Sequence, residues 1–275
     1  MIGGSFLTNK KKAIVLGGGG SLGSYQVGAF KYLYEIGYNY DIIYGSSIGS
    51  VNGSIMCQGL ESYPYLQELW DNISIRDITE DDIEMNMDTS SKINTIKTIV
   101  DIAKVLKKNI KTLGANTDNF YNFLTEKVDI NKVLNSPIDF KLNTINITIP
   151  HVTVIDKRRM GDKLIDYVIA SSRATPVLQP HKIKHGFIYN YYVDGGFADN
   201  LMVSQALKDG YEDILAIDLT YLKPTHPEYM NDSRVKYIFP SENLGSFFTF
   251  DHEVLSKNME IGYKDIKEYF EKKYK

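Results

Sequence analysis

Residues 41–54 read DIIYGSSIGSVNGS, in which a short apolar run is followed by a glycine, two serines and a second glycine. The run Ile42–Tyr44 predicts a buried strand, and the residues from Ile48 onward predict a helix lined by small side chains. The segment GSSIG at the junction has the Gly-x-Ser-x-Gly pattern that is typical of a nucleophile elbow. We therefore predict that Ser47 has strained backbone geometry and lies at the carboxyl edge of a sheet, next to a helix N-terminus that favours negative charge.

A similar strand-loop-helix unit precedes this one. The run AIVL, Ala13–Leu16, is continuous, largely β-branched and followed by glycines, which predicts a central parallel strand buried on both faces. After the glycines, apolar residues at largely helical spacing from Tyr25 to Ile36 predict a helix. Two such units in succession predict a layered α/β fold with right-handed connections.

The pattern changes between residues 61 and 140. An acidic stretch from Asp77 to Asp88 precedes apolar residues at steps of three and four from Ile93 to Leu113, which predicts a strongly amphipathic helix. Two interpretations stay open for this helix: a surface helix packed on the core, or a cap or lipid-facing lid over a site. We expect a variable helical insertion at about 61–140 within a single domain that spans 8–275.

Further strands and helices are predicted in the C-terminal half. Apolar residues alternate from Leu142 to Ile149 and predict a strand, which VTVID at 152–156 is expected to continue. The run ILAIDLT at 214–220 predicts another buried strand, after a helix from Val203 to Gly210. Residues 251–275 predict a C-terminal amphipathic helix.

Composition narrows the class of protein. The chain has 275 residues, 43% of them apolar, and a net charge of −3, so it can bury a large core and does not favour a nucleic-acid partner. Cys57 is the single cysteine, which excludes an internal disulfide and favours a reducing compartment. No secretory h-region follows the N-terminal lysines, and no apolar run approaches about 18 residues. We expect a cytoplasmic protein whose contact with membranes, if it has one, is peripheral; the oligomeric state stays open.

A serine nucleophile needs hydrogen-bond donors for the oxyanion that it creates, each contributing roughly 3 kcal/mol. The glycine-rich stretch IVLGGGGSLGSYQVG at 14–28 follows a predicted strand and opens a predicted helix, so its backbone N–H groups can converge on one point. The alternative interpretation is a dinucleotide-binding loop, since GGGSLG also fits Gly-x-Gly-x-x-Gly. That interpretation expects an acidic residue at the end of the second strand, whereas Asp41 precedes that strand and the serine bend follows it.

The predicted nucleophile also needs a base. A Ser-Asp-His order would leave His226 and His252 as the histidine candidates, although neither lies in a sequence context that marks it as a triad member. Asp194 comes directly after an aromatic and apolar run and before two glycines, so its carboxylate can closely approach another loop. The alternative for this stretch is an ordinary Asp-Gly hairpin turn.

These motifs together resemble the patatin-like phospholipase family. The resemblance rests on GGGSLG at 18–23, GSSIG at 45–49 and DGG at 194–196, in that order, and extends over most of the chain from Lys12 to about Thr220. The segment SSRATP at 171–176 is similar to the Ser-x-Ala-x-Pro segment of the family. The glycines that support the three motifs are Gly23, Gly45, Gly49, Gly195 and Gly196.

The resemblance implies a three-layer α/β/α fold with a mostly parallel sheet, and a Ser-Asp dyad of Ser47 as nucleophile and Asp194 as general base. It also implies an oxyanion hole of backbone N–H groups, which we assign to Gly18, Gly19 and Gly20. The implied reaction is acyl transfer from a lipid or other acyl ester, without a metal or cofactor.

One residue departs from the family pattern. The family usually has Arg or Lys before the last glycine of the loop, and this chain has Leu22 there, so a charge that could bind a lipid head group is missing. Two alternatives stay open: a Ser-His-Asp carboxylesterase, and a catalytically weak lipid-binding protein with the same fold.

Overall fold

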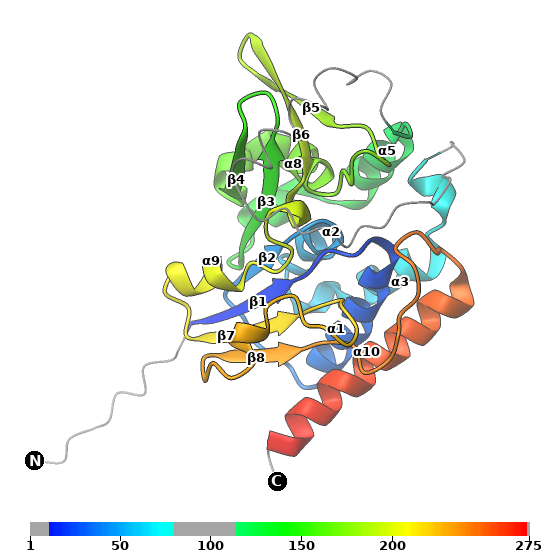
Figure 1. Ribbon diagram of the computed structural model, residues 1–275, viewed down its shortest axis with the longest axis vertical. Helices are drawn as coiled ribbons and strands as arrows, with labels where there is room; N and C mark the ends of the chain where they lie inside the picture. Colours follow the sequence, from blue (N-terminus) through cyan, green and yellow to red (C-terminus); the bar gives the residue numbers. More distant parts are fainter. Residues whose placement is uncertain (1–10, 80–113, 274–275) are drawn as a thin grey trace, which may run out of the picture.

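The computed structural model describes residues 11–79 and 114–273, which form an eight-stranded sheet with helices packed against it (Figure 1). The strand order is β5-β6-β3-β2-β1-β7-β8, and β4 pairs with β3 outside this path. The neighbours β3-β2-β1-β7-β8 are parallel, whereas β4, β5 and β6 pair antiparallel. The strands are β1 (Lys12–Leu16), β2 (Ile42–Gly45), β3 (Asp139–Asn146), β4 (His151–Asp156), β5 (His181–His185), β6 (Ile188–Asp194), β7 (Asp213–Ile217) and β8 (Val235–Ile238).

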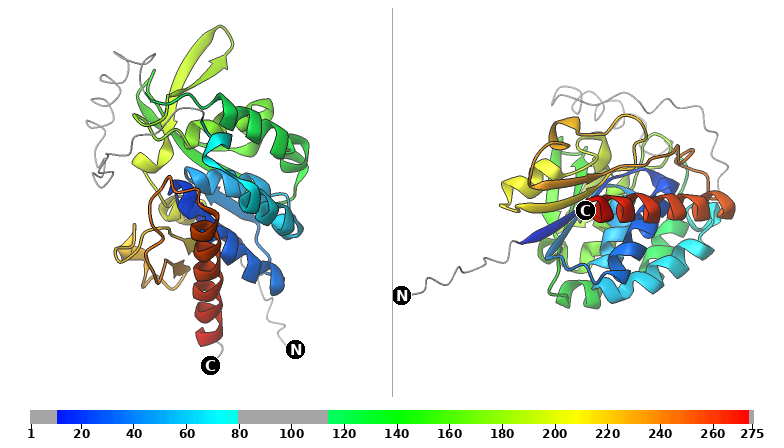
Figure 2. Two further views of the ribbon diagram at one scale, coloured as in Figure 1. Left: turned by 90° about the vertical axis from the view of Figure 1, so that its right-hand side faces the viewer. Right: turned by 90° about the horizontal axis from the view of Figure 1, so that it is seen from below.

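Helices cover both faces of the sheet, which confirms the predicted α/β fold class (Figure 2). The larger apolar cluster lies between the sheet and a group of helices that includes α1, α2, α3 and α10, and the smaller cluster lies under α9. The helices are α1 (Ser24–Glu35), α2 (Ile48–Met56), α3 (Tyr63–Asn72), α5 (Asp118–Lys127), α6 (Ile130–Asn135), α7 (Lys157–Met160), α8 (Leu164–Ser171), α9 (Val203–Lys208) and α10 (His252–Lys273).

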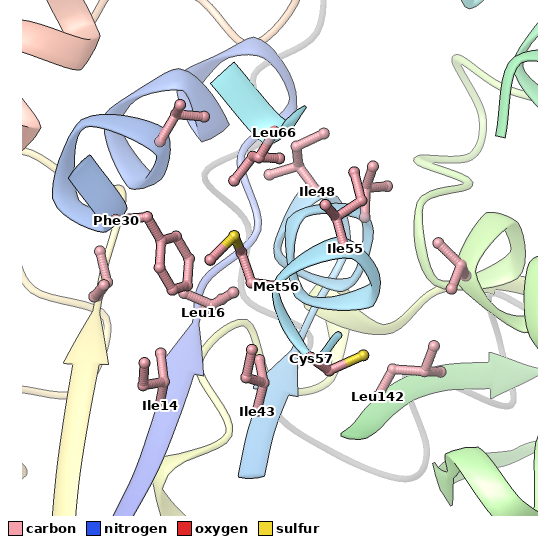
Figure 3. Packing of buried hydrophobic residues seen from close by; sticks show 14 of the residues in the cluster. Ile14, Leu16, Phe30, Ile43, Ile48, Ile55, Met56, Cys57, Leu66 and Leu142 are labelled. Carbon is pink, nitrogen blue, oxygen red and sulfur yellow. The ribbon is translucent and has the colours of Figure 1, made fainter. Parts of the chain in front are cut away.

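The central strand β1 is buried on both faces, as its continuous apolar run predicts. Ile14 and Leu16 belong to the larger cluster, whereas Ala13 and Val15 belong to the smaller one. The alternation follows from the two-residue period of a strand, which sends successive side chains to opposite faces. Figure 3 shows side chains of β1, β2 and β3 meeting those of the helices above them.

The two predicted strand-loop-helix units are β1-α1 and β2-α2. The prediction for VTVID is wrong, because these residues form β4, which runs antiparallel to β3 with Asn146 opposite His151. The chain reverses because the Asn146 side-chain oxygen accepts the backbone N–H groups of Thr148 and Ile149, at 2.9 and 3.0 Å. An Asn that bonds to the backbone two and three residues later competes with strand continuation, and the apolar alternation did not reveal this turn.

Two glycines allow α1 and α10 to pack with their backbones in contact. A Cβ on Gly28 would lie 1.8 Å from the Met259 carbonyl oxygen, and a Cβ on Gly262 would lie 2.0 Å from the Tyr25 carbonyl oxygen. The two positions are reciprocal, since each helix supplies one glycine and one carbonyl. The C-terminal helix is thereby fixed against the helix that follows the glycine-rich loop.

The region predicted as a helical insertion, 61–140, contains α3, α5 and α6 among the described residues. The predicted amphipathic helix from Ile93 to Leu113 lies outside the described residues, and its role as a lid stays a prediction. Within 11–79 and 114–273, no helix has both the length and the apolar composition needed to cross a bilayer.

Candidate active site

Ser47 lies at the sharp bend between β2 and α2. Its φ of 51° and ψ of −125° fall in a region that non-glycine residues rarely adopt, which costs of order 1–3 kcal/mol. The flanking residues must be glycine, because a Cβ on Gly45 would lie 2.5 Å from the Gly49 carbonyl oxygen and a Cβ on Gly49 would lie 2.4 Å from the Leu16 carbonyl oxygen. The local geometry is that of the predicted elbow.

The Ser47 hydroxyl donates a hydrogen bond of 2.6 Å from Oγ to Oδ2 of Asp194, across 147 positions of sequence. Strand pairing explains how the two meet. On one edge of β3, residues 141–146 pair with β4, and its other edge is shared by β2 and β6. Gly45 of β2 lies opposite Leu142, and Asp194 of β6 lies opposite Thr144. Because β2 and β6 run in opposite directions, their carboxyl ends face each other.

The Asp194 carboxylate is almost completely buried, with 5% of the residue exposed. Its Oδ1 accepts the backbone N–H of Gly196 at 2.7 Å, so the two oxygens have separate partners. Burial raises the pKa of the Asp194 carboxyl from 3.8 to about 7, although the hydrogen bonds from Ser47 and Gly196 lower it. Residues 195–197 form a short 3-10 helix rather than the hairpin turn considered as an alternative.

The glycine-rich loop lies against Ser47. A Cβ on Gly18 would be only 2.7 Å from the Ser47 Cβ, which explains the absence of a side chain there. The Gly18 N–H donates to the backbone and side-chain oxygens of Asn200, both at 3.2 Å, so it has acceptors already. In the part of the chain that the structure describes, the N–H groups of Gly19 and Gly20 donate to no protein acceptor. Of the three predicted oxyanion donors, these two are free to donate hydrogen bonds to a ligand oxygen.

Two residues position the site and were not assigned a role from the sequence. The side-chain oxygen of Asn200 accepts a hydrogen bond from the Gly18 N–H, and its Nδ2 donates one to the Gly18 carbonyl at 3.1 Å. Asn200 therefore joins the glycine-rich loop to the DGG segment. Ser171 accepts the Ser47 N–H at 3.0 Å through its Oγ. An Asn six residues after the predicted base, and a Ser in SSRATP, were the only signals that the sequence offered.

The histidines considered for a triad have other surroundings. His226 contacts Asp199 through Nε2 and Glu228 through Nδ1, both at 3.0 Å. The hydrogen bond with Asp199 is the main cause that raises the pKa of His226, so both ring nitrogens are engaged by carboxylates. His252 is exposed at the start of α10 and lines a cavity of about 290 Å³ with Trp70 and Met259. Asp194, not an imidazole, holds the position next to the Ser47 hydroxyl.

Leu22, the departure from the family pattern, is 5% exposed and belongs to the larger apolar cluster. The position therefore contributes to the core in this chain. Within residues 11–79 and 114–273, no three side chains of His, Cys, Asp or Glu gather into a group that could hold a metal ion.

Comparison with known families agrees with this geometry. A family model described as patatin-like phospholipase matches residues 14–207, which include the glycine-rich loop, the elbow and Asp194. The chain belongs to the patatin-like phospholipase family. The match covers more than half of the chain and ends within α9.

Curated relatives of this patatin-like chain are much longer proteins. Patatin-like phospholipase domain-containing protein 7 of Rattus norvegicus is 28% identical over 214 residues, which is 78% of this chain and 14% of that protein. Lysophospholipase nte1 of Aspergillus terreus is 43% identical over 58 residues, which is 21% of this chain and 4% of that protein. The chain thus spans a small part of the length of these relatives.

A solved structure has the same fold. VipD from Legionella pneumophila matches 96% of this patatin-like chain and 67% of its own chain, with a TM-score of 0.56 and 13% sequence identity. At this identity the match concerns the fold alone.

Proposed function

We propose that this protein is a serine lipid acyl hydrolase of the phospholipase A or lysophospholipase type, with Ser47 as nucleophile and Asp194 as general base. The observation that supports it most is the 2.6 Å hydrogen bond between the two side chains at a strained elbow. Membership of the patatin-like phospholipase family and the printed names of the relatives support a lipid ester as the substrate.

The reaction proceeds in two steps. Ser47 Oγ attacks the ester carbonyl carbon while Asp194 Oδ2 accepts the hydroxyl proton, and the alcohol leaves with a proton returned by Asp194. Water then attacks the acyl-serine while Asp194 accepts a proton from it. Asp194 passes this proton to Ser47 Oγ as the fatty acid is released. The free N–H groups of Gly19 and Gly20 stabilise the oxyanion in both steps.

A buried aspartate suits this role better than an exposed one. An ordinary carboxylate is a weak base for a hydroxyl, whereas the raised pKa of Asp194, about 7, matches the pH at which a base is both deprotonated and effective. The strained backbone of Ser47 and the hydrogen bond from its N–H to Ser171 hold the hydroxyl in line with this base.

The test is hydrolysis of p-nitrophenyl acyl esters by the wild type, Ser47→Ala and Asp194→Asn. Both variants are expected to lose about 10³-fold or more in kcat, because each removes one member of the proton-transfer pair. A fluorophosphonate probe should label the wild type at Ser47 and leave Ser47→Ala unlabelled.

Histidine variants separate the dyad from a triad. His226→Ala and His252→Ala are expected to keep near-wild-type kcat, since neither ring contacts Ser47 in the described structure. A loss of activity in either one, with the fold retained by circular dichroism, would favour a Ser-His-Asp esterase instead. Wild-type turnover by Asp194→Asn would exclude Asp194 as the general base.

A further inference from the structure

Two neighbouring β-hairpins carry much of the exposed apolar surface. Across residues 11–79 and 114–273, fourteen large apolar side chains are exposed, and six of them lie on these hairpins: Ile149, Val152, Val154, Phe187, Ile188 and Tyr189. The hairpins lie side by side, since the Ile147 N–H donates to the Tyr191 carbonyl at 2.8 Å. Both project from one end of the molecule, and the C-terminal end of α10 lies at the opposite end (Figures 1 and 2).

The tip of the β5–β6 hairpin is the most exposed part of this surface. Phe187 is exposed to 103% of its reference area and the adjacent Ile188 to 65%. A single exposed apolar residue needs no explanation, but two consecutive ones at a protruding turn gain little from packing within the chain. Burial of these two side chains against a binding partner would remove their apolar surface from water, which is favourable.

The charges around this tip identify the partner. Residues 181–193, HKIKHGFIYNYYV, contain two lysines and two histidines and no acidic residue, in a chain whose net charge is −3. Lys182 and Lys184 are both exposed, and their Nζ atoms lie 3.9 and 5.9 Å from the centre of the Tyr189 ring. An apolar tip followed by an amphipathic aromatic ring and basic side chains is the order of groups met on leaving the acyl region of an anionic bilayer.

We propose that the β5–β6 hairpin docks this protein on an anionic lipid surface. Phe187 and Ile188 enter the acyl layer, Tyr189 lies at the level of the head groups, and Lys182 and Lys184 bind the anionic head groups. The exposed Ile149 at the turn of the neighbouring hairpin widens the contact. The choice of a lipid as partner rests on the proposed function, but the surface and its charge preference do not require catalysis.

The hairpin is connected to the candidate active site through one strand. β6 begins at Ile188 and ends at Asp194, and seven residues of strand span about 20 Å. Docking through the tip therefore leaves the Ser47–Asp194 pair unobstructed. For the same reason, changes at the tip are expected to leave the hydrolysis of a small soluble ester unaltered.

The test is co-sedimentation with vesicles of phosphatidylcholine containing about one third phosphatidylglycerol. The wild type is expected to bind these vesicles, and to bind vesicles of phosphatidylcholine alone about tenfold more weakly. The double variant Phe187→Ser with Ile188→Ser should bind the anionic vesicles about tenfold more weakly than the wild type. Lys182→Glu with Lys184→Glu should lose the preference for anionic vesicles.

Matched controls distinguish this surface from a general effect of composition. Ile36→Ser changes an apolar residue exposed to 44% at the end of α1, and Lys208→Glu with Lys264→Glu makes the same charge change on α9 and α10. All controls should bind anionic vesicles as the wild type does. In Phe187→Trp, the new indole should shift its emission to the blue when vesicles are added, whereas Trp70 is 3% exposed and should not respond.

Absence of vesicle binding by the wild type, or equal binding by the wild type and both hairpin variants, would overturn the proposal. A dimer in sedimentation velocity that only the hairpin variants dissociate would assign the tip to a second copy of this chain and would also overturn it. The result is independent of the proposed function, because Ser47→Ala should bind vesicles as the wild type does. Loss of soluble-ester hydrolysis in Ser47→Ala tests the dyad separately.

Discussion

At the scale of single residues, the features that favour chemistry at the site are unfavourable for stability. Ser47 has a positive φ, and Asp194 keeps a carboxylate away from water with one hydroxyl and one N–H as its partners. Both arrangements cost free energy that the rest of the fold must supply. Such costs are typical of active sites, because a base with a raised pKa needs a desolvated environment.

The raised pKa of Asp194 predicts opposite effects of pH on activity and stability. Activity towards a soluble ester should fall about tenfold per pH unit below about 7, because in the proposed mechanism only the carboxylate accepts the Ser47 proton. The folded-state pKa lies above the unfolded one, so the favourable contribution to the free energy of unfolding is present below about pH 4 and is lost as pH rises through 7. The total loss is about 4 kcal/mol, from roughly three pKa units.

Asp194→Asn provides the control for this prediction. The amide does not titrate, so the wild type alone should lose stability as pH rises. The free energy of unfolding of the variant minus that of the wild type should therefore increase by about 2–3 kcal/mol from about pH 5 to about pH 8. Urea unfolding at the two pH values measures it. A stability difference that does not change with pH would mean that Asp194 has an ordinary pKa in the folded state.

At the scale of elements, glycines determine how closely the pieces approach. The glycine-rich loop touches the elbow because Gly18 has no side chain, and α1 touches α10 because Gly28 and Gly262 have none. The neighbours in the helix pair are carbonyl oxygens of the opposite backbone, which cannot rotate away as a side chain can. An added methyl group must therefore push the helices apart.

Gly28→Ala and Gly262→Ala are each expected to lower the free energy of unfolding by about 3 kcal/mol, despite the better helix propensity of alanine. The double variant should lose clearly less than the sum, because one separation of α1 from α10 relieves both contacts. Gly210→Ala is the matched control: its φ is +87° and its Cβ would meet no atom within 4 Å, so only backbone strain of about 1 kcal/mol is expected. Additive losses in thermal or urea unfolding would contradict the shared contact.

At the scale of the whole molecule, one apolar cluster joins the sheet to the helices on one face. Cys57, which caps α2, is completely buried in this cluster, and burial raises the pKa of its thiol to about 12 (Figure 3). Its reactivity therefore reports the opening of the core rather than a local event.

Cys57 is the single thiol, so its labelling by a disulfide reagent gives one signal for the whole fold. In native buffer the reaction is expected to be about 10³-fold or more slower than in urea, and the free energy derived from the slow rate should match that of global unfolding. Cys57→Ser should show no reaction under either condition. Rapid labelling of the native protein would mean that α2 opens separately from the core.

Part of the site was predictable because its signals are local. The elbow is read from a strand, a glycine pattern and a helix within fourteen residues, and the family from three motifs in order. The strands β5 and β8 were not predicted, because HKIKH has a single apolar residue and VKYI is only four residues long, so neither gives a clear pattern. The turn at Asn146 was missed for a related reason, since its side-chain hydrogen bonds interrupt an apolar alternation that continues past it.

The sequence by itself determined the two strand-loop-helix units, the strained serine and the family, because periodicity and turn chemistry act over a few residues. Only the tertiary structure decided that Ser47 and Asp194 touch, since this depends on β2 and β6 sharing one edge of β3. It also decided that Asn200 engages the Gly18 N–H, which leaves Gly19 and Gly20 as free donors. Contacts between distant segments depend on which strands pair and how helices pack, and a local pattern does not carry that information.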